Sequence, residues 1–115
     1  MRYLMLIYAD EQAGPKEGTP EQMKMFQGYG GFTEEVNKLG ISESSERLRP
    51  ITDATTVRVR DGKTVVTDGP FAETREQLGG YYLLNCEDLD HAIALAAKIP
   101  SAEFGSIEVR PIFEM

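Results

Sequence analysis

The segment from Asp68 to Gly80 concentrates side chains that could do chemistry. Its sequence, DGPFAETREQLGG, holds the acids Asp68, Glu73 and Glu76, the cation Arg75, an amide and an aromatic ring. A connection that only reverses the chain needs Gly and Pro but not this polar content. Asp68 or Glu73 could move a proton, and Arg75 could bind an anionic substrate. Two alternatives compete: Asp68 could organise the turn by accepting backbone N–H bonds, and the later charges could face solvent on a helical turn.

Further residues could complete such a site. Arg58 lies between two valines of an expected strand, so it needs either a carboxylate across an interface or an anionic ligand. Tyr8 and Asp10 end the first expected strand, and Tyr81 begins a later one. Tyrosines in such places serve either as ligand contacts or as core and interface residues with a bonded hydroxyl. If a ligand binds, we expect it to contact residues 68–77 together with Arg58 and the strand end at Tyr8 and Asp10.

Other kinds of site lack the residues that they need. His91 is the only histidine and Cys86 the only cysteine, so the sequence predicts neither a metal site nor a cofactor. Cys86 lies on an apolar strand and is expected to act as a small hydrophobic residue. His91 lies off the inner stripe of its expected helix, which indicates an exposed side chain. The glycines at positions 28, 30 and 31 follow no strand, unlike a phosphate-binding loop.

The length and charge of the chain limit its partners. A chain of 115 residues forms one domain, here residues 1–115. The net charge of −7 argues against direct binding to nucleic acid or to an anionic membrane, since both need clustered Lys and Arg. The apolar stretch at residues 3–9 is too short to span a bilayer, and acidic residues rather than a cleavage site follow it. We therefore expect a cytoplasmic protein.

Two segments predict strands that are apolar on both faces, residues 2–9 and residues 80–86. The first strand has two sets of apolar side chains on opposite faces: Tyr3, Met5 and Ile7 on one, Leu4, Leu6 and Tyr8 on the other. Strands of this kind have to be covered on both sides, so both are expected to be central in a sheet. A last strand at residues 106–113 contains Pro111, which favours an edge position.

Two helices and a hairpin are also predicted. The first helix begins with Thr19 as the N-cap and ends at Gly40, and its glycines suggest a kink or a break. The second runs from about residue 88 to 98. Their expected inner stripes are Met23, Phe26, Tyr29 or Gly30, Val36 and Leu39 in the first, and Leu89, Ala92, Ile93, Ala96 and Ile99 in the second.

The sequence Asp61-Gly62 predicts a two-residue hairpin turn. A tight turn pairs Arg58 with Val65 and places Arg58 on the face opposite to Asp68. The two side chains would then share a site only if the strand bulges.

The order strand, helix, strands, hairpin, strand, helix, strand predicts an α+β fold, a ferredoxin-like split βαβ with an inserted hairpin. Two helices can cover only one face of its sheet. The other face would expose an apolar patch on the order of several hundred Å², which indicates an interface.

The chain resembles the YCII-related family, and the sequence Asp-Gly-Pro-Phe at 68–71 resembles its DGPF branch. Residues 1–10, 54–63, 80–84 and 106–111 also fit the family, while residues 11–52 are the least typical. The resemblance implies a homodimer that packs sheet against sheet into a dimeric α+β barrel.

The resemblance implies two alternative functions. One is a metal-free enzyme for proton transfer, isomerisation or elimination on a small aromatic or lactone-like acid. The other is a non-catalytic binding or regulatory module, because family members are often encoded beside or fused to extracytoplasmic-function sigma factors. Relatives in the wider group carry a His–Asp pair, but this chain has no histidine in the corresponding early region.

Overall fold

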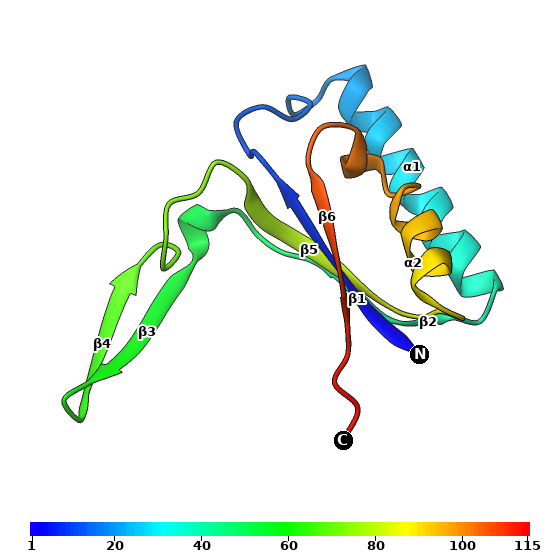
Figure 1. Cartoon of the computed structure of the whole chain (residues 1–115). Coiled ribbons are helices and arrows are strands. Elements are labelled where there is room, and N and C mark those ends of the chain that lie inside the picture. The colour runs from blue at the N-terminus through cyan, green and yellow to red at the C-terminus, as the bar shows by residue number, and fades with distance from the viewer.

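The computed structural model describes all residues from 1 to 115, and its body is a four-stranded antiparallel sheet with two helices on one face (Figure 1). The strands follow the order β2-β5-β1-β6. Their bounds are β1 Arg2–Ala9, β2 Ser42–Arg47, β5 Gln77–Asn85 and β6 Ser106–Pro111, and the helices are α1 Pro20–Lys38 and α2 Leu89–Ala96. This arrangement is the predicted ferredoxin-like α+β fold, with β1 and β5 in the centre and β6 at an edge.

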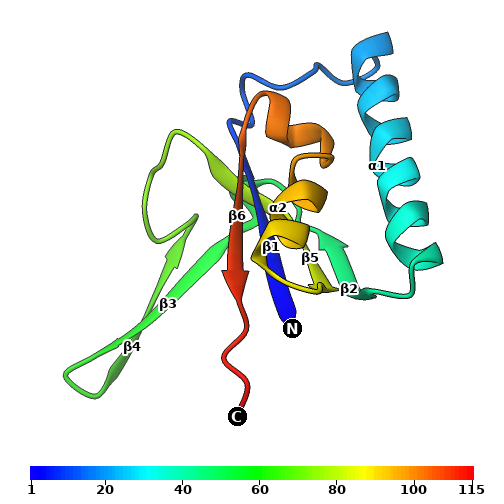
Figure 2. The same ribbon diagram turned by 45° about the vertical axis from the view of Figure 1, so that its right-hand side comes forward.

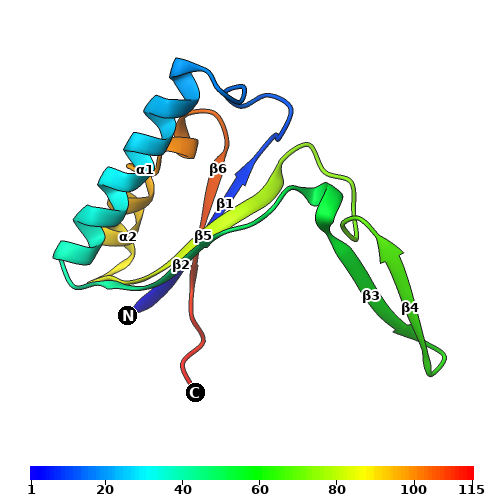
Figure 3. The same ribbon diagram turned by 180° about the vertical axis from the view of Figure 1, so that it is seen from behind.

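A second sheet contains only the hairpin of β3 (Thr55–Arg60) and β4 (Lys63–Asp68), which projects from the body as an arm (Figure 3). The predicted pairing of Arg58 with Val65 is confirmed. Asp61 and Gly62 have φ values of 52° and 75°, as a two-residue turn with two left-handed positions requires. The radius of gyration is 16.0 Å, whereas a compact domain of this length has about 13 Å.

The core lies between the helices and one face of the sheet. Its members alternate along the two central strands and come from both helices and the residues next to β5 and α2: Tyr3, Met5, Ile7, Phe32, Val36, Tyr82, Leu84, Cys86, Ala92, Leu95, Ala96 and Ile99. The predicted two-sided character of β1 and β5 is confirmed, since the alternate side chains on their other face are only partly buried.

The predicted inner stripes of the helices are wrong in part. In α1, Phe32 and Val36 are buried, while Met23 and Phe26 are exposed. The reason is that only the C-terminal half of α1 packs closely on the sheet. In α2, Leu95 is buried, whereas Leu89 is 50% exposed and Ile93 is 51% exposed. Its buried face is therefore rotated from the predicted one.

The predicted interruption of α1 is also wrong, because the helix continues through its glycines. Thr19 caps it as predicted, and its hydroxyl oxygen accepts a hydrogen bond from the Gln22 N–H at 3.2 Å. A Cβ at Gly28 would lie 3.0 Å from Pro100 Cγ, so glycine permits a close approach between α1 and the segment after α2. Gly30 and Gly31 face open space. Each lowers the stability of the helix by about 1 kcal/mol relative to alanine, and no close packing offsets this cost.

No helix covers the other face of the sheet, because α1 and α2 both lie on the same side (Figure 2). This open face carries the alternate side chains of the central strands, all partly buried: Leu4, Leu6, Tyr8, Tyr81 and Leu83. None of the helices is long and apolar enough to cross a membrane.

Candidate functional site

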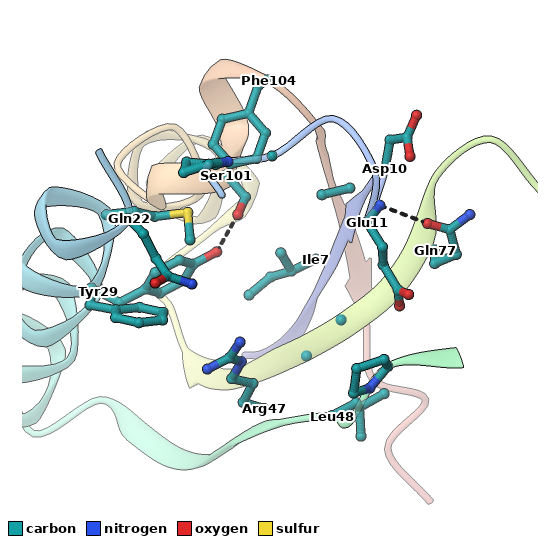
Figure 4. A pocket seen from close by; sticks show the side chains of 18 of the residues that line it. Ile7, Asp10, Glu11, Gln22, Tyr29, Arg47, Leu48, Gln77, Ser101 and Phe104 are labelled. Atoms are coloured by element: carbon teal, nitrogen blue, oxygen red, sulfur yellow. Dashed lines mark hydrogen bonds between the residues drawn. The ribbon is translucent and has the colours of Figure 1, made fainter. Parts of the chain in front are cut away.

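A pocket of about 850 Å³ lies between the N-terminal half of α1 and the end of the sheet (Figure 4). It exists because α1 contacts the core through Phe32 and Val36, near its C-terminal end, and has no buried residue nearer its start. The sheet beneath this end offers small residues, among them Ser45, Gly79 and Gly80. These side chains do not fill the space that the helix leaves open.

Gly80 shapes the floor of the pocket through backbone geometry. It pairs with Arg47 where β2 and β5 run side by side. A Cβ at Gly80 would lie 2.7 Å from the backbone oxygen of Glu46, closer than real contacts allow. Glycine is therefore required for the two strands to approach, and it leaves the floor without a side chain at this point.

The walls of the pocket come from segments far apart in the sequence. Gln22, Met25 and Tyr29 extend from α1, and the loop at residues 10–17 follows β1. The short 3₁₀ segment Pro100–Glu103 adds Ser101, the following residue Phe104 adds an aromatic ring, and the stretch 46–52 closes the opposite side. Only the folded chain brings these segments together.

At one end of the pocket, the hydroxyl of Tyr29 lies 2.5 Å from the hydroxyl of Ser101. Ser101 is only 5% exposed. Burial raises the pKa of the Tyr29 phenol above its ordinary value, and the hydrogen bond with Ser101 and, to a smaller extent, the charge of Arg47 oppose this rise. The phenol therefore stays protonated at neutral pH and can donate or accept hydrogen bonds.

Arg47 lies at the end of β2, and Figure 4 shows its guanidinium directed into the pocket. Its Cζ lies 5.2 Å from the ring centroid of Phe26, a cation–π contact that holds the side chain in place. Arg47 makes no ion pair and no side-chain hydrogen bond within the chain.

The two acids that follow β1 are occupied by backbone groups. Asp10 accepts a hydrogen bond from the Gln12 N–H at 2.9 Å, and its carboxylate points away from the cavity in Figure 4. The carboxylate of Glu11 accepts the Ile51 N–H at 3.2 Å, and the Glu11 N–H donates to Gln77 Oε1 at 2.9 Å. Glu11 thus joins the end of β1 to the segment before the arm.

Of the residues predicted from sequence, Asp10 and Tyr81 line this pocket, while Tyr8 does not. The Tyr81 hydroxyl lies 2.9 Å from the Ser44 hydroxyl on the open face, so its ring is directed away from α1. Tyr8 also lies on the open face, beside Ser106 of β6. The structure brings Asp10 and Arg75 together at a second, smaller hollow.

The remaining predicted residues lie outside the pocket. Asp68 is at the base of the arm, Glu73 and Arg75 are exposed in the following loop, and Arg58 is exposed on β3. Arg58 Nη2 donates a long hydrogen bond of 3.4 Å to the Phe71 carbonyl. The register confirms that Arg58 and Asp68 lie on opposite faces of the arm.

The hydrogen bonds of the turn after β4 come from groups other than the Asp68 carboxylate, so they lend no support to the turn-organising alternative for this side chain. The Thr56 hydroxyl donates to the Gly69 carbonyl at 2.8 Å, and the Gly69 N–H donates to the Ala54 carbonyl at 2.8 Å. Gly69 itself has φ of 93°, a conformation that favours glycine.

His91 has a structural role and is partly buried rather than exposed as predicted. Its Nδ1 accepts the Glu87 N–H at 3.1 Å, and its own N–H donates to the Asp88 carboxylate at 2.8 Å, which caps α2. Cys86 is buried in the core as predicted, and burial raises the pKa of its thiol. No group of three or more His, Cys, Asp or Glu side chains is arranged to hold a metal ion.

Sequence reasoning missed Arg47, Ser101 and the place of Tyr29 in the pocket. Arg47 ends the strand SESSER, which has no apolar alternation and gives no strand signal. The glycine pair at positions 79 and 80 is the one feature of the sequence that points to the pocket, since glycine in a strand indicates that another backbone or a ligand approaches closely.

The fold and pocket define an α+β domain of the ferredoxin-like type with a cavity between its first helix and its sheet. The chain belongs to the YCII-related domain family, whose sequence profile matches residues 1–115. It is also similar to Uncharacterized protein R00369 of Rhizobium meliloti (strain 1021). The two are 38% identical over 114 residues, which cover 97% of this chain and 92% of that protein.

Proposed function

We propose that this protein binds a small molecule in the pocket between α1 and the sheet. The observation that carries the proposal is the combination of a cavity of about 850 Å³ with polar side chains that converge on it from separate elements. Small-molecule sites commonly have about 300–1,000 Å³ and a few placed polar groups on a mainly apolar surface. Here Arg47, Tyr29 and Gln22 are such groups.

Catalysis is the second candidate, and the hydroxyl pair of Tyr29 and Ser101 favours it. A protonated phenol can donate a hydrogen bond to a substrate oxygen that gains negative charge, as proton transfer, isomerisation or elimination on a small aromatic or lactone-like acid would require. Such a reaction also needs a base, and the carboxylates of Asp10 and Glu11 already accept backbone N–H groups. Binding without turnover is therefore the better-supported function.

The catalytic roles of Asp68 and Glu73 stay predictions, as does a regulatory partnership with an extracytoplasmic-function sigma factor. Asp68→Asn and Glu73→Gln would test the former, because each removes charge with little change in volume. Loss of turnover with unchanged ligand affinity in either variant would support catalysis at the segment 68–77. Co-purification with a sigma factor encoded beside the gene would test the latter.

A homodimer through the open sheet face is also part of the proposal. The apolar side chains of this face have no cover within the chain, although a patch of that kind marks an interface. The pocket lies on the helix side, so pairing of two sheets would leave it accessible. This interface would add stability without closing the site.

The arm would belong to the same interface. Val57, Val59 and Val66 share one of its faces and are 60%, 62% and 61% exposed. An isolated two-stranded hairpin with such a face is marginally stable in water, so the arm is expected to pack on a second copy. The arm carries three basic and two acidic residues, whereas the whole chain has a net charge of −7, so attraction to the partner's body would favour this contact.

A ligand screen with a blocked pocket tests the proposed function. Ser45→Phe places a ring on the floor, and Gln27→Phe adds the same ring to an exposed position of α1 outside the pocket as a control. Compounds that bind should raise the melting temperature of the wild type and of Gln27→Phe but not of Ser45→Phe. Equal stabilisation of all three proteins, or NMR shift changes confined to residues 68–76, would contradict a site in this pocket.

A further inference from the structure

Arg47 is placed to receive a ligand rather than to stabilise the fold. In the register of β2 and β5 it pairs with Gly80, two residues from the pair of Ser45 and Tyr82. Tyr82 is buried on the helix side of the sheet, so Arg47 lies on that side as well. The glycine opposite offers no side chain, and the guanidinium therefore extends over the floor of the pocket, as Figure 4 shows.

The guanidinium of Arg47 has N–H donors without a partner, unlike those of three other arginines. Arg2 pairs with Glu114, Arg49 with Asp53 and Arg110 with Glu108. Arg47 Cζ lies over the ring of Phe26, and this contact restrains the side chain. Its N–H edge stays free, and that edge matches the two oxygens of a carboxylate.

The acids around the pocket do not neutralise Arg47. Asp10 and Glu11 accept backbone N–H groups on the far side of the cavity. Glu46 borders the pocket, but in the register it pairs with Tyr81, so its side chain is directed to the open face of the sheet. Glu17 of the loop after β1 also lines the pocket, and like the other acids it forms no ion pair with Arg47. The guanidinium therefore keeps a full positive charge that a ligand carboxylate could meet.

The rest of the pocket suits a flat apolar group. Ile7, Met25, Phe26, Leu48 and Phe104 present carbon surface around the space that Arg47 borders. Tyr29 and Ser101 also line this space, and their hydroxyls could bind a small polar substituent. We infer that the pocket takes a small monocarboxylate with a planar, mainly apolar body, whose carboxylate binds the N–H edge of Arg47.

This inference rests on the proposed binding function and adds a ligand class to it. The test uses matched pairs of aromatic acids and their neutral amides, such as benzoate and benzamide, titrated into the full-length protein and followed by two-dimensional NMR. We expect the acid of a pair to bind at least about ten-fold tighter than its amide, because hydrogen bonds to charged groups are the stronger ones. Added salt should weaken the binding of the acid and leave the binding of the amide unchanged.

Variants then assign the effect to Arg47. Arg47→Ala should reduce acid affinity to that of the amide, and Arg47→Lys should keep part of it, because lysine retains the charge but not the planar fork. Arg49→Ala removes a neighbouring arginine that pairs with Asp53 and should bind as the wild type does. An unchanged melting temperature of Arg47→Ala, whose side chain makes no ion pair, would show that the fold is intact.

The outcomes separate the two levels of the proposal. If amides bind in the pocket as tightly as acids and Arg47→Ala has no effect, the pocket is a binding site and the carboxylate class is wrong. If no acid–amide pair and no compound of a wider screen binds, the proposed function and the ligand class both fail. Acid binding that Arg49→Ala weakens as much as Arg47→Ala does would also overturn the role of Arg47.

Discussion

The hydroxyl of Tyr29 lies 2.5 Å from that of Ser101 and so connects the middle of α1 to the segment after α2. Nearby, a second hydroxyl pair joins Thr33 of α1 to Tyr82 of β5 at 2.7 Å. The first contact fixes α1 against the segment after α2, and the second fixes it against the sheet. Together they set the position of the helix and therefore the width of the pocket beneath its N-terminal half.

Removal of either hydroxyl at the first contact should destabilise the protein. Tyr29→Phe leaves the buried Ser101 hydroxyl without its partner, so we expect the free energy of unfolding to fall by about 1 kcal/mol. Ser101→Ala should have a similar effect, and the double variant should cost less than the sum of the two. Urea denaturation of the four proteins measures the coupling, and strict additivity would show that the contact contributes nothing.

Stability should fall at alkaline pH because burial raises the pKa of Tyr29. The folded protein keeps this proton after the unfolded chain, with a tyrosine pKa of about 10, has lost it. The contribution of the protonated phenol to the free energy of unfolding is thus complete below a pH of about 10 and is lost as the pH rises through the pKa of the folded protein. Buried Cys86, whose thiol pKa is also raised, acts in the same direction. The difference between wild type and Tyr29→Phe in urea titrations isolates the phenol, and parallel curves would contradict this account.

The three glycines of α1 should respond differently to alanine. Gly30→Ala and Gly31→Ala place a methyl group in open space and should each stabilise the protein by about 1 kcal/mol. At Gly28 the added carbon would lie 3.0 Å from Pro100 Cγ. The same gain in helix stability is therefore offset by steric crowding. Thermal melts of the three variants give the comparison. A gain at Gly28 equal to the other two would show that α1 has room to move.

Gly80 and Gly79 form a matched pair in β5. Gly80→Ala would place its Cβ 2.7 Å from the backbone oxygen of Glu46, whereas the nearest atom to a Cβ at Gly79 is the Ile7 oxygen at 3.9 Å. We expect Gly80→Ala to cost about 1–3 kcal/mol in the free energy of unfolding and Gly79→Ala to cost much less. Chemical denaturation checks both, and equal costs would contradict a specific close approach at Gly80.

The open sheet face should mediate the proposed homodimer. Leu6→Glu adds a charge to the centre of this face and should convert dimers to monomers in light scattering at micromolar concentration. Met23→Glu adds the same charge to an exposed position of α1 and should leave the dimer intact. A wild-type protein that is monomeric under these conditions, or a Leu6→Glu variant that still dimerises, would disprove this interface.

The sequence by itself determined the features that depend on local periodicity and turn chemistry. Two-sided alternation placed β1 and β5 at the centre of the sheet, and Asp61-Gly62 specified the hairpin and its register, since a two-residue turn leaves no freedom in pairing. Thr19, as an N-cap residue, likewise predicted the start of α1.

Only the tertiary structure decided which helix faces were buried and where the pocket lies. The apolar residues of α1 extend around much of the helix, so its contact with β5 selected Phe32 and Val36 over Met23. The pocket depends on distant segments, because Arg47, Tyr29 and Ser101 come together through packing rather than through spacing along the chain. Local sequence sets the conformation of neighbouring residues, but the space between a helix and a sheet is set by the few side chains that hold them apart.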